Sequence, residues 1–554
     1  MFSAARRQDQ IDQLNRQSFD VVIIGGGITG AGIALDAISR GLSVAIIDMQ
    51  DFAGGTSSRS TKLVHGGLRY LKQAQVGIVA EVGRERKIVY ENGVHITTPL
   101  GMLLPFYKGG QFGPITTSIG LKVYDSLAGV KKSERRVMLS PEETLQKEPL
   151  LKKDGLRGGG LYVEYRTDDA RLTIEVLKRA VELGAVALNY VKALSFIYDD
   201  NKKVAGIYAI DQITKREITI RGKAVVNAAG PWVNEVMERD PLASSKKALL
   251  RTKGVHIVID QSIFPLKQSV YFDTEDGRMI FAIPREGKAY VGTTDTIYHD
   301  DPVEPVATSE DVAYILDAVH YIFPDVDVSF KDVESTWSGV RPLIYEKGKD
   351  PSEVSRKDEV WESESGLLTM AGGKLTGYRR MAEEVVDRLV KRKEFKGTGP
   401  CVTKELSLSG ATMLTPENFD AYVAFKGDEG VQYGLTKKVA EELVHKYGTN
   451  IEDIYRILRV TKNDYKDRGL PVDLYLEVIY GMQFEMAYTP ADVFIRRTGK
   501  LYFDIQQVRK YKDEVISLMS DYLEYTDHEK ALHQQELEQL LEDATHFAKE
   551  GLHG

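Results

Sequence analysis

The sequence contains a single cysteine, Cys401, among 554 residues. One thiol cannot form a disulfide within the chain, and it cannot build a thiolate metal cluster. We therefore expect a reducing, cytoplasmic environment and no metal site. No CxxC pattern surrounds Cys401, which favours an inert side chain.

The chain also lacks a long uninterrupted apolar run. The most apolar window, residues 21–38, is long enough for a membrane span but contains five glycines and Asp36. It divides into a short strand and a helix, which excludes a span there. Arg6 and Arg7 are not followed by the apolar stretch of a secretory signal. Any membrane contact is therefore expected to be peripheral.

An excess of positive charge is absent too. The 73 Lys and Arg residues face 81 Asp and Glu residues, which gives a net charge of −8. Nucleic-acid binders usually carry a strongly basic domain, so no nucleic-acid partner is expected. A local basic pocket for a small anion remains compatible with this charge. The length is sufficient for two or three domains.

What is present near the N-terminus is a dinucleotide-binding pattern. Residues 19–24 (FDVVII) predict a short buried strand, residues 31–40 a helix, and residues 43–47 a second strand. A GxGxxG motif joins the first strand to the helix, and an acid follows the second strand. The residues of the motif and the acid are Gly25, Gly27, Gly30 and Asp48.

Each residue of this pattern has a physical role. Gly25 permits a tight turn, Gly27 lets a pyrophosphate approach the backbone, and Gly30 lets the helix pack closely on the strand. Asp48 accepts hydrogen bonds from a ribose diol, which disfavours a 2′-phosphate and hence NADP. The pattern alone does not separate NAD from FAD. Residues 51–60 (DFAGGTSSRS) either wrap an extended cofactor or form a plain surface linker.

The middle of the chain predicts alternating helices and strands. Residues 169–183 have a broad apolar face typical of a helix, and strands are expected at 186–188, 204–210 and 224–226. Small residues and Pro231 follow the last of these strands. Such residues let the chain pass close to a ligand and begin a helix.

Later segments predict a sheet and then a helical domain. Residues 255–295 alternate as strands of an antiparallel sheet, a suitable floor for a substrate pocket. Residues 366–389 predict a strand, a Gly-Gly turn and a helix with Thr376 as its N-cap. Helical patterns dominate from about residue 400. They recur at 436–445, 513–523 and 536–547.

Residues 101–136 mix apolar and aromatic residues with glycines and end in a basic run. This composition is similar to a peripheral membrane-contact element. An ordinary loop and helix with a solvated basic end explains it equally well.

Residues 61–71 (TKLVHGGLRYL) place His65 and Arg69 four residues apart, with two glycines between them. A helix would bring both side chains to one face, but the glycine pair makes a helix unfavourable. We expect instead a turn whose backbone passes tightly against the bound cofactor, with His65, Arg69 and Tyr70 close to the ligands.

Several motifs in order resemble FAD-dependent glycerol-3-phosphate dehydrogenases, within the glycine/D-amino-acid oxidase superfamily. They are VVIIGGGITGAGIALDAISRGLSVAIID, SSRSTKLVHGGLRYL, NAAGPWV, KGVHIVI, VGTTD, SGVRPL and AGGKLTGYRRMAEE. The resemblance implies an α/β fold: a Rossmann-type FAD-binding domain, an antiparallel-sheet substrate domain and an all-α C-terminal domain. Residues 1–400 would hold the first two, with the sheet mainly at about 250–345, and residues 401–554 the third.

The resemblance also implies an activity. The expected reaction is oxidation of sn-glycerol 3-phosphate to dihydroxyacetone phosphate, with hydride transfer from C2 to flavin N5. The electrons would pass to membrane quinone, with the protein held peripherally on the inner face of the cytoplasmic membrane. A homodimer is compatible with this reading, and the sequence leaves the oligomeric state open. The alternatives are an α-glycerophosphate oxidase that makes H₂O₂ from O₂, and a non-catalytic flavin-binding sensor.

The resemblance carries over to individual residues, although the family's ribose acid is often Glu where this chain has Asp48. Arg341 and Arg356 are implied as phosphate ligands, with Arg69 and Lys374 near the substrate and flavin; a surface ion pair is the plain alternative for any single Arg. Further residues expected at the substrate are Tyr70 and Thr376. The residues expected at FAD are Gly25, Gly27, Gly30, Asp48, Thr56, Ser57, Ser58, Lys62, Val191, Gly230, Gly373 and Leu375.

Removal of the C2 hydroxyl proton requires a base with a pKa near neutrality, most often His. His65 and His256 are the candidates. His256 lies in a predicted strand, where a satisfied core histidine is an alternative. His65 lies beside the glycine pair and is the favoured base.

Overall fold

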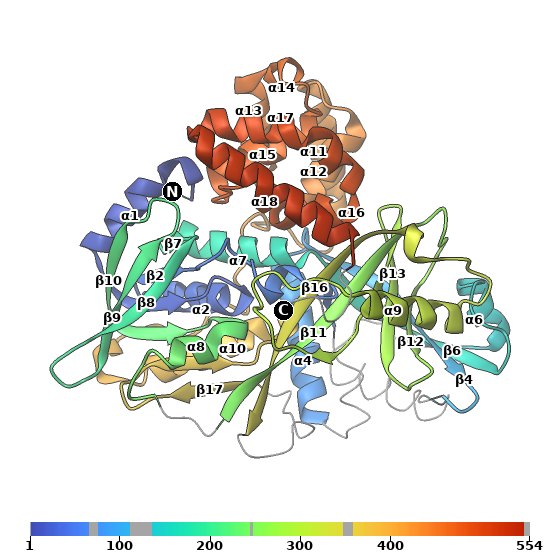
Figure 1. Cartoon of the computed structure of the whole chain (residues 1–554), viewed down its shortest axis with the longest axis horizontal. Helices are drawn as coiled ribbons and strands as arrows, with labels where there is room; N and C mark the ends of the chain where they lie inside the picture. The colour runs from blue at the N-terminus through green and yellow to red at the C-terminus, as the bar shows by residue number, and fades with distance from the viewer. Residues whose placement is uncertain are drawn as a thin grey trace.

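The computed structural model describes residues 2–65, 76–110, 113, 136–243, 247–346 and 358–547. A parallel-sheet region and a second, larger sheet lie side by side, and a group of helices from the C-terminal part covers both (Figure 1). The predicted fold class, with its Rossmann-type region and helical C-terminal region, is confirmed.

Eight strands of the described residues form the first sheet, in the order β17-β18-β10-β1-β2-β7, with β9 paired to β10 and β8 paired to β9. The strands β18, β10, β1, β2 and β7 run parallel, so their carboxyl ends meet at one edge. The bounds are β1 (Ser18–Ile24), β2 (Val44–Ile47), β7 (Val186–Leu188), β8 (Val191–Tyr198), β9 (Val204–Asp211), β10 (Glu217–Asn227), β17 (Glu359–Glu362) and β18 (Leu368–Ala371). The apolar runs of β1 and β2 are almost fully buried, as parallel strands covered on both faces require.

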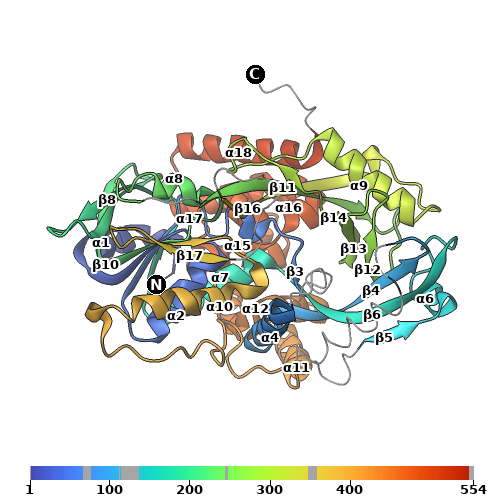
Figure 2. The ribbon, with the colours of Figure 1, turned by 90° about the horizontal axis from the view of Figure 1, so that it is seen from below.

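Helices cover this sheet and set the approach to its edge. Helix α2 (Ile28–Ser39) packs against both α7 (Asp169–Glu182) and α10 (Tyr378–Leu389), and Figure 2 shows α2 and α10 side by side. Asp168 caps α7, since its side chain accepts a hydrogen bond from the Arg171 amide at 3.0 Å. The remaining helices before residue 400 are η1 (Ala4–Arg6), α1 (Arg7–Arg16), η2 (Thr56–Ser58), α4 (Val76–Asn92), α6 (Pro141–Lys147), η4 (Gly230–Trp232), α8 (Val233–Met237), α9 (Ser309–Ile322), η5 (Phe330–Asp332), η7 (Leu375–Gly377) and η8 (Lys393–Phe395).

The second sheet contains ten strands within the described ranges and is largely antiparallel, although β12 and β4 pair in parallel. The predicted antiparallel neighbours within 255–295 are confirmed. Strands from residues 63–167 extend this sheet beyond the expected segment. Its strands are β3 (Leu63–Val64), β4 (Thr97–Tyr107), β5 (Val137–Leu139), β6 (Leu156–Thr167), β11 (Lys247–Asp260), β12 (Ser269–Asp273), β13 (Met279–Arg285), β14 (Lys288–Gly292), β15 (Thr296–Ile297) and β16 (Val333–Glu346).

The C-terminal helices share one core with the second sheet. Helix α18 lies along β16, and its first turn is held by a capping box between Thr526 and Glu529. The elements are α11 (Phe419–Gln432), α12 (Lys437–Tyr447), η9 (Gly448–Asn450), α13 (Ile451–Thr461), α14 (Asp464–Asp467), α15 (Val472–Phe484), η10 (Asp492–Arg497), α16 (Lys500–Phe503), α17 (Ile505–Leu523) and α18 (Asp527–Thr545). Element η10 is a π-helix, a rare form that is often found at functional sites.

Two expectations need correction or restriction. Thr376 is not the N-cap of α10, because Gly377 occupies that position and makes no side-chain capping bond. The beginning of the suspected membrane-contact segment is strand β4, in which Met102, Leu103 and Leu104 are buried. Residues 114–135 lie outside the described residues. Within the described part of the chain, none of the helices is both long and apolar enough to cross a membrane.

Candidate cofactor and substrate site

A cavity of about 1010 Å³ lies at the carboxyl edge of the parallel sheet. Its wall includes the turns that follow β1, β2, β10 and β18, and the facing strands β11 and β16. Ligands of open parallel sheets bind at this edge, where loops and helix N-termini expose backbone N–H groups. The cavity therefore combines the predicted dinucleotide site with the predicted substrate sheet.

The glycine motif forms a cradle that side chains would fill. Gly25 has φ +110°, and a Cβ placed on it would lie 2.4 Å from the carbonyl oxygen of Ala228. A Cβ on Gly30 would lie 1.8 Å from the carbonyl oxygen of Gly25, so α2 approaches the turn only because residue 30 has no side chain. Gly25 and Gly27 line the cavity, whereas Gly30 lies behind its wall.

Asp48 lies on the cavity wall at the end of β2. Its carboxylate accepts hydrogen bonds from the backbone amides of Gly26 at 2.6 Å and Gln50 at 2.8 Å. Burial raises the pKa of Asp48 to about 7, and these two amide bonds offset only part of that effect. A carboxylate on the cavity wall is suited to accept hydrogen bonds from a ribose diol.

The Ser/Thr-rich loop after Asp48 holds the cavity wall together. The hydroxyl of Ser57 accepts a hydrogen bond from the amide of Ile28 at 2.9 Å, at the first turn of α2. Thr56 donates a hydrogen bond to the carbonyl oxygen of Val340 at 2.6 Å. The loop therefore links the cofactor helix to the strand that carries Arg341.

Ser58 and Lys62 do not line the cavity. The Ser58 hydroxyl donates to the Gly55 carbonyl oxygen, and Lys62 forms a buried ion pair with Asp169 at 2.6 Å. Asp169 also accepts hydrogen bonds from the amide and hydroxyl of Ser60. Both predicted residues therefore act on the loop itself in this structure, and direct contact with the cofactor stays a prediction.

His65 follows β3 and faces the cavity. Its backbone is bound by the Thr376 hydroxyl, which accepts from the His65 amide and donates to the His65 carbonyl oxygen, both at 3.1 Å. Burial lowers the pKa of His65 below its ordinary value, and the positive charges of Lys374 and Arg86 lower it further against the opposing effect of Glu164. The imidazole is therefore neutral near pH 7.

His256 also borders the cavity, but it is far more enclosed. It is 1% exposed and stacks on Trp337 with ring centroids 4.7 Å apart. Its Nε2 lies 3.0 Å from the hydroxyl of Thr61. Burial lowers its pKa well below the ordinary value, aided by Arg341 and Lys62. Its Nδ1 is buried without a hydrogen-bond partner among the described residues, so these contacts satisfy only one ring nitrogen, and the choice between a base and a core histidine stays a prediction.

Arg341 reaches the cavity from β16. Its guanidinium donates hydrogen bonds to the Thr293 hydroxyl at 2.9 Å and to the Thr294 carbonyl oxygen at 3.2 Å. It also lies 3.3 Å from a carboxylate oxygen of Asp295. These partners fix the plane of a cation that is still 31% exposed. A fixed, accessible guanidinium is suited to bidentate binding of an anion.

The Gly-Gly turn after β18 also lines the cavity. The amide of Gly373 donates to a carboxylate oxygen of Asp358 at 2.8 Å. Burial raises the pKa of Asp358, and Lys374 opposes that effect. The other predicted residues that line the cavity are Val191, Gly230, Lys374, Leu375 and Thr376. Arg69, Tyr70 and Arg356 lie outside the described residues.

Sequence reasoning missed two groups at this site. The Thr61 hydroxyl is hydrogen-bonded to His256. The only feature of the sequence that could have indicated this residue was its position directly after the predicted loop. Asp51 is buried behind Asp48 and is held by Arg496 and Arg497, which come from the C-terminal helices. No local pattern links residues so far apart in the chain.

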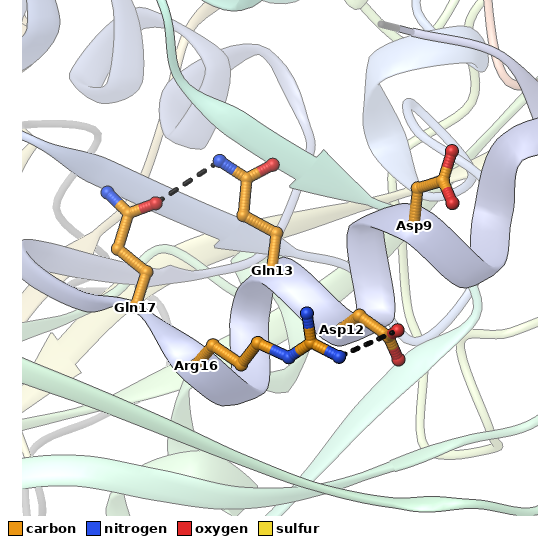
Figure 3. Close-up of a pocket in the computed structure, with 5 residues that line it drawn as sticks. All are labelled: Asp9, Asp12, Gln13, Arg16 and Gln17. Carbon is orange, nitrogen blue, oxygen red and sulfur yellow. Dashed lines mark hydrogen bonds and ion pairs between the residues drawn. The ribbon is translucent and has the colours of Figure 1, made fainter.

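A second hollow lies on the surface of α1, between Asp9, Asp12, Gln13, Arg16 and Gln17 (Figure 3). Its side chains pair along the helix, with Gln13 bonded to Gln17 and Arg16 to Asp12. These are exposed i,i+4 contacts of a solvated helix face. The hollow has no connection to the cavity wall described above.

Residues 20–379 match the FAD-dependent oxidoreductase family, and residues 401–530 match the C-terminal domain of alpha-glycerophosphate oxidase. The chain belongs to the FAD-dependent oxidoreductase family, and FAD is its cofactor. The glycine cradle, the carboxyl group of Asp48 and the cavity of about 1010 Å³ fit this cofactor. Bound FAD would be held by the turns after β1, β2 and β18.

Individual relatives narrow the resemblance. The chain is 58% identical over 548 residues to an aerobic glycerol-3-phosphate dehydrogenase of Staphylococcus aureus, covering 98% of each. A crystal structure of glycerol-3-phosphate dehydrogenase from Bacillus halodurans complexed with FAD matches with a TM-score of 0.86 and 45% identity, covering 98% of this chain and 99% of that one. An L-alpha-glycerophosphate oxidase from Mycoplasma pneumoniae shares only the fold, with a TM-score of 0.55, 17% identity, and coverage of 68% of this chain and 96% of that one.

Proposed function

We propose that this chain oxidises sn-glycerol 3-phosphate to dihydroxyacetone phosphate. The observation that carries the proposal is a single cavity in which the FAD cradle, His65 and Arg341 meet. Full-length similarity to glycerol-3-phosphate dehydrogenases supports the choice of substrate. FAD, which the turns after β1, β2 and β18 would hold, would supply the hydride acceptor for oxidation at C2 of the substrate.

The substrate's phosphate is bound by cations on the sheet side of the cavity. Arg341 is held by three oxygen atoms of residues 293–295, which leaves its guanidinium oriented before substrate arrives. Preorganisation of this kind lowers the entropic cost of binding. Lys374, which lines the same cavity, adds a second positive charge. Arg356 and Arg69 are proposed to complete the set, with Tyr70 beside them.

His65 is the proposed base for the C2 hydroxyl. A general base must be unprotonated before it accepts a proton, and the lowered pKa of His65 satisfies this condition at neutral pH. The Thr376 hydroxyl holds the His65 backbone and thereby fixes where the ring enters the cavity. His256 is the second candidate, and its contacts with Thr61 and Trp337 support a proposed role in the cavity wall.

The proposed electron acceptor is membrane quinone, reached by peripheral binding to the inner face of the cytoplasmic membrane. A second candidate acceptor is O₂, with H₂O₂ as the product. The match of residues 401–530 to the C-terminal domain of alpha-glycerophosphate oxidase supports O₂ as the second candidate. Both candidates share the same half-reaction at the flavin.

The test of the half-reaction is anaerobic addition of sn-glycerol 3-phosphate to the purified flavoprotein. We expect the visible flavin band to bleach, with one equivalent of dihydroxyacetone phosphate formed for each flavin. Glycerol without phosphate is the matched control and should leave the band unchanged at the same concentration. A yellow protein whose spectrum ignores glycerol 3-phosphate would exclude the proposal and favour a flavin-binding sensor.

The acceptor is tested on the same preparation in air. Turnover that requires a soluble quinone analogue and releases little H₂O₂ identifies the dehydrogenase. Stoichiometric H₂O₂ without quinone identifies the oxidase. Recovery of the protein with membrane vesicles, and its release by high salt, tests peripheral binding separately.

A further inference from the structure

The loop that carries the ribose acid is anchored from the C-terminal domain. Asp51, three residues after Asp48, is 1% exposed. Its carboxylate accepts hydrogen bonds from both terminal nitrogens of Arg497, at 2.8 and 3.0 Å, and from Nε of Arg496 at 2.6 Å. Both arginines belong to the π-helix η10, more than 440 positions further along the chain.

The anchored loop touches the cofactor cradle directly. Phe52 is fully buried beneath the glycine turn, so that a Cβ on Gly26 would lie 2.4 Å from its ring. The Ala53 amide donates to the Gly26 carbonyl oxygen at 3.1 Å. Movement of Asp51 would therefore displace both Asp48 and the backbone that surrounds the pyrophosphate.

The neighbouring loop is anchored by the same C-terminal residues. Asn189 donates to both Asp51, at 2.8 Å, and the Met486 carbonyl oxygen, at 3.0 Å. The Tyr190 hydroxyl donates to Asp492 of η10 at 2.6 Å. The next residue is Val191, which lines the cavity and whose amide donates to the Asp48 carbonyl oxygen at 2.6 Å. Both loops that face the ribose are thus bound from behind by residues 486–497.

We propose that Arg496 and Arg497 are positioning residues for FAD, which hold the ribose-binding loop in place through Asp51. The C-terminal domain then completes the cofactor site without touching the cofactor. The inference rests on the FAD site alone and is independent of the proposed substrate. Two arginines on one buried carboxylate keep Asp51 ionised, and the pKa of Asp51 is lowered by both of them against the effect of burial.

The test uses the full-length chain, stripped of flavin and titrated with FAD between pH 5.5 and 8.5. Asp51→Asn and Arg496→Gln each remove a charged hydrogen bond behind the loop, and each should weaken FAD affinity about tenfold or more. Lys426→Gln is the matched control. It removes the ion pairs of a mostly buried lysine in the same domain with Glu429 and the exposed Glu452, none of which holds the loop.

A pH readout separates positioning from general loosening. The charge of Asp51 raises the pKa of Asp48, whereas the charge of Arg496 lowers it. The pH midpoint of FAD binding should therefore move down in Asp51→Asn and up in Arg496→Gln. Midpoints that stay fixed or move together would overturn the proposal. FAD affinities equal to that of Lys426→Gln would overturn it as well.

Tyr190→Phe keeps the proposal testable if a charge variant fails to fold. It removes only the hydroxyl that binds Asp492 and leaves every charge in place. FAD affinity should fall by about threefold to tenfold with an unchanged pH midpoint. Wild-type affinity in this folded variant would overturn the proposal. Catalytic assays play no part in these measurements, so their outcome is separate from that of the proposed activity.

Discussion

Asp48 connects the protonation state of one residue to cofactor affinity. Burial raises its pKa to about 7, so the flavin-free protein holds a neutral carboxyl group in mildly acid solution. The donors of a ribose diol prefer the carboxylate. FAD affinity should therefore rise as the pH increases through about 7, by at most about tenfold for each pH unit below that value.

Asp48→Asn should remove this pH dependence and weaken FAD binding above pH 7. Asp48→Glu, which keeps an ionisable acid, is the control and should restore a sloping profile. Titration of the flavin-free protein by flavin fluorescence measures both. A wild-type profile that is flat from pH 5.5 to 8.5 would contradict the assignment.

The raised pKa also predicts that the contribution of Asp48 to folding stability is present below about pH 4 and is lost as the pH rises through about 7.

His65→Asn tests the proposed base. Loss of a general base costs about 10²–10⁴-fold in kcat, and FAD should remain bound because the imidazole does not hold the cradle. In the native protein the acid limb of kcat/KM should lie below pH 6.5, since a lowered pKa keeps His65 unprotonated there. Stopped-flow reduction of the flavin measures the step directly.

His256→Asn is the comparison for that variant. A small effect at His256 together with a large one at His65 supports the assignment. The reverse pattern would transfer the role of base to His256. Unchanged turnover in His65→Asn across the pH range would remove His65 from the chemistry.

At the scale of elements, one side chain joins two segments more than 300 residues apart in the chain. The Thr376 hydroxyl binds both backbone groups of His65, so η7 and the end of β3 move together. Thr376→Val removes both bonds while keeping the shape of the side chain. It should destabilise the fold by about 1–2 kcal/mol and lower kcat about tenfold or more through misplacement of His65.

Thr376→Ser retains the hydroxyl and should behave like the native protein in both assays. Flavin reduction rates and chemical denaturation, measured together, distinguish the two effects. Equal kcat values in Thr376→Val and Thr376→Ser would show that His65 does not depend on this contact.

Across the whole molecule, buried ion pairs join the C-terminal domain to the cofactor domain. Both carboxylate oxygens of Glu485 accept hydrogen bonds from Arg171 of α7, one of them at 2.7 Å. The ammonium of Lys178 lies 3.4 Å from one of these oxygens. These cations lower the pKa of Glu485 to about 2. The stability that it contributes is therefore present above about pH 4.5 and is lost as the pH falls toward 2.

Glu485→Gln should lower the free energy of unfolding by about 3–5 kcal/mol, because it removes one of the two carboxylates that pair with buried Arg171 and Lys178 and leaves them only Glu175. Denaturant unfolding followed by circular dichroism measures the loss. Glu442→Gln, which breaks an exposed pair with Lys438, should change it by about 0–1 kcal/mol. Similar losses of unfolding free energy in both variants would show that the buried pairs of Glu485 stabilise the fold no more than an exposed pair does.

Local patterns were sufficient wherever a residue's role depends on its neighbours in the chain. The βαβ segment, its glycines and Asp48 were predicted because a strand, a tight turn and a helix are coded within about thirty residues. The helices of the C-terminal domain were predicted from their apolar periodicity. The capping role of Thr376 was predicted wrongly, since its hydroxyl is engaged by His65 and is unavailable to α10.

The sequence by itself determined the class of cofactor site, the alternation of elements and the candidate residues His65 and Arg341. Only the tertiary structure decided which candidates share a cavity, that His256 is enclosed against Trp337, and that Asp51 is held by η10. The physical reason is the range of the interactions. Backbone turns and helix periodicity are set by nearby residues, whereas burial, pKa shifts and ion pairs depend on side chains that folding brings together from distant segments.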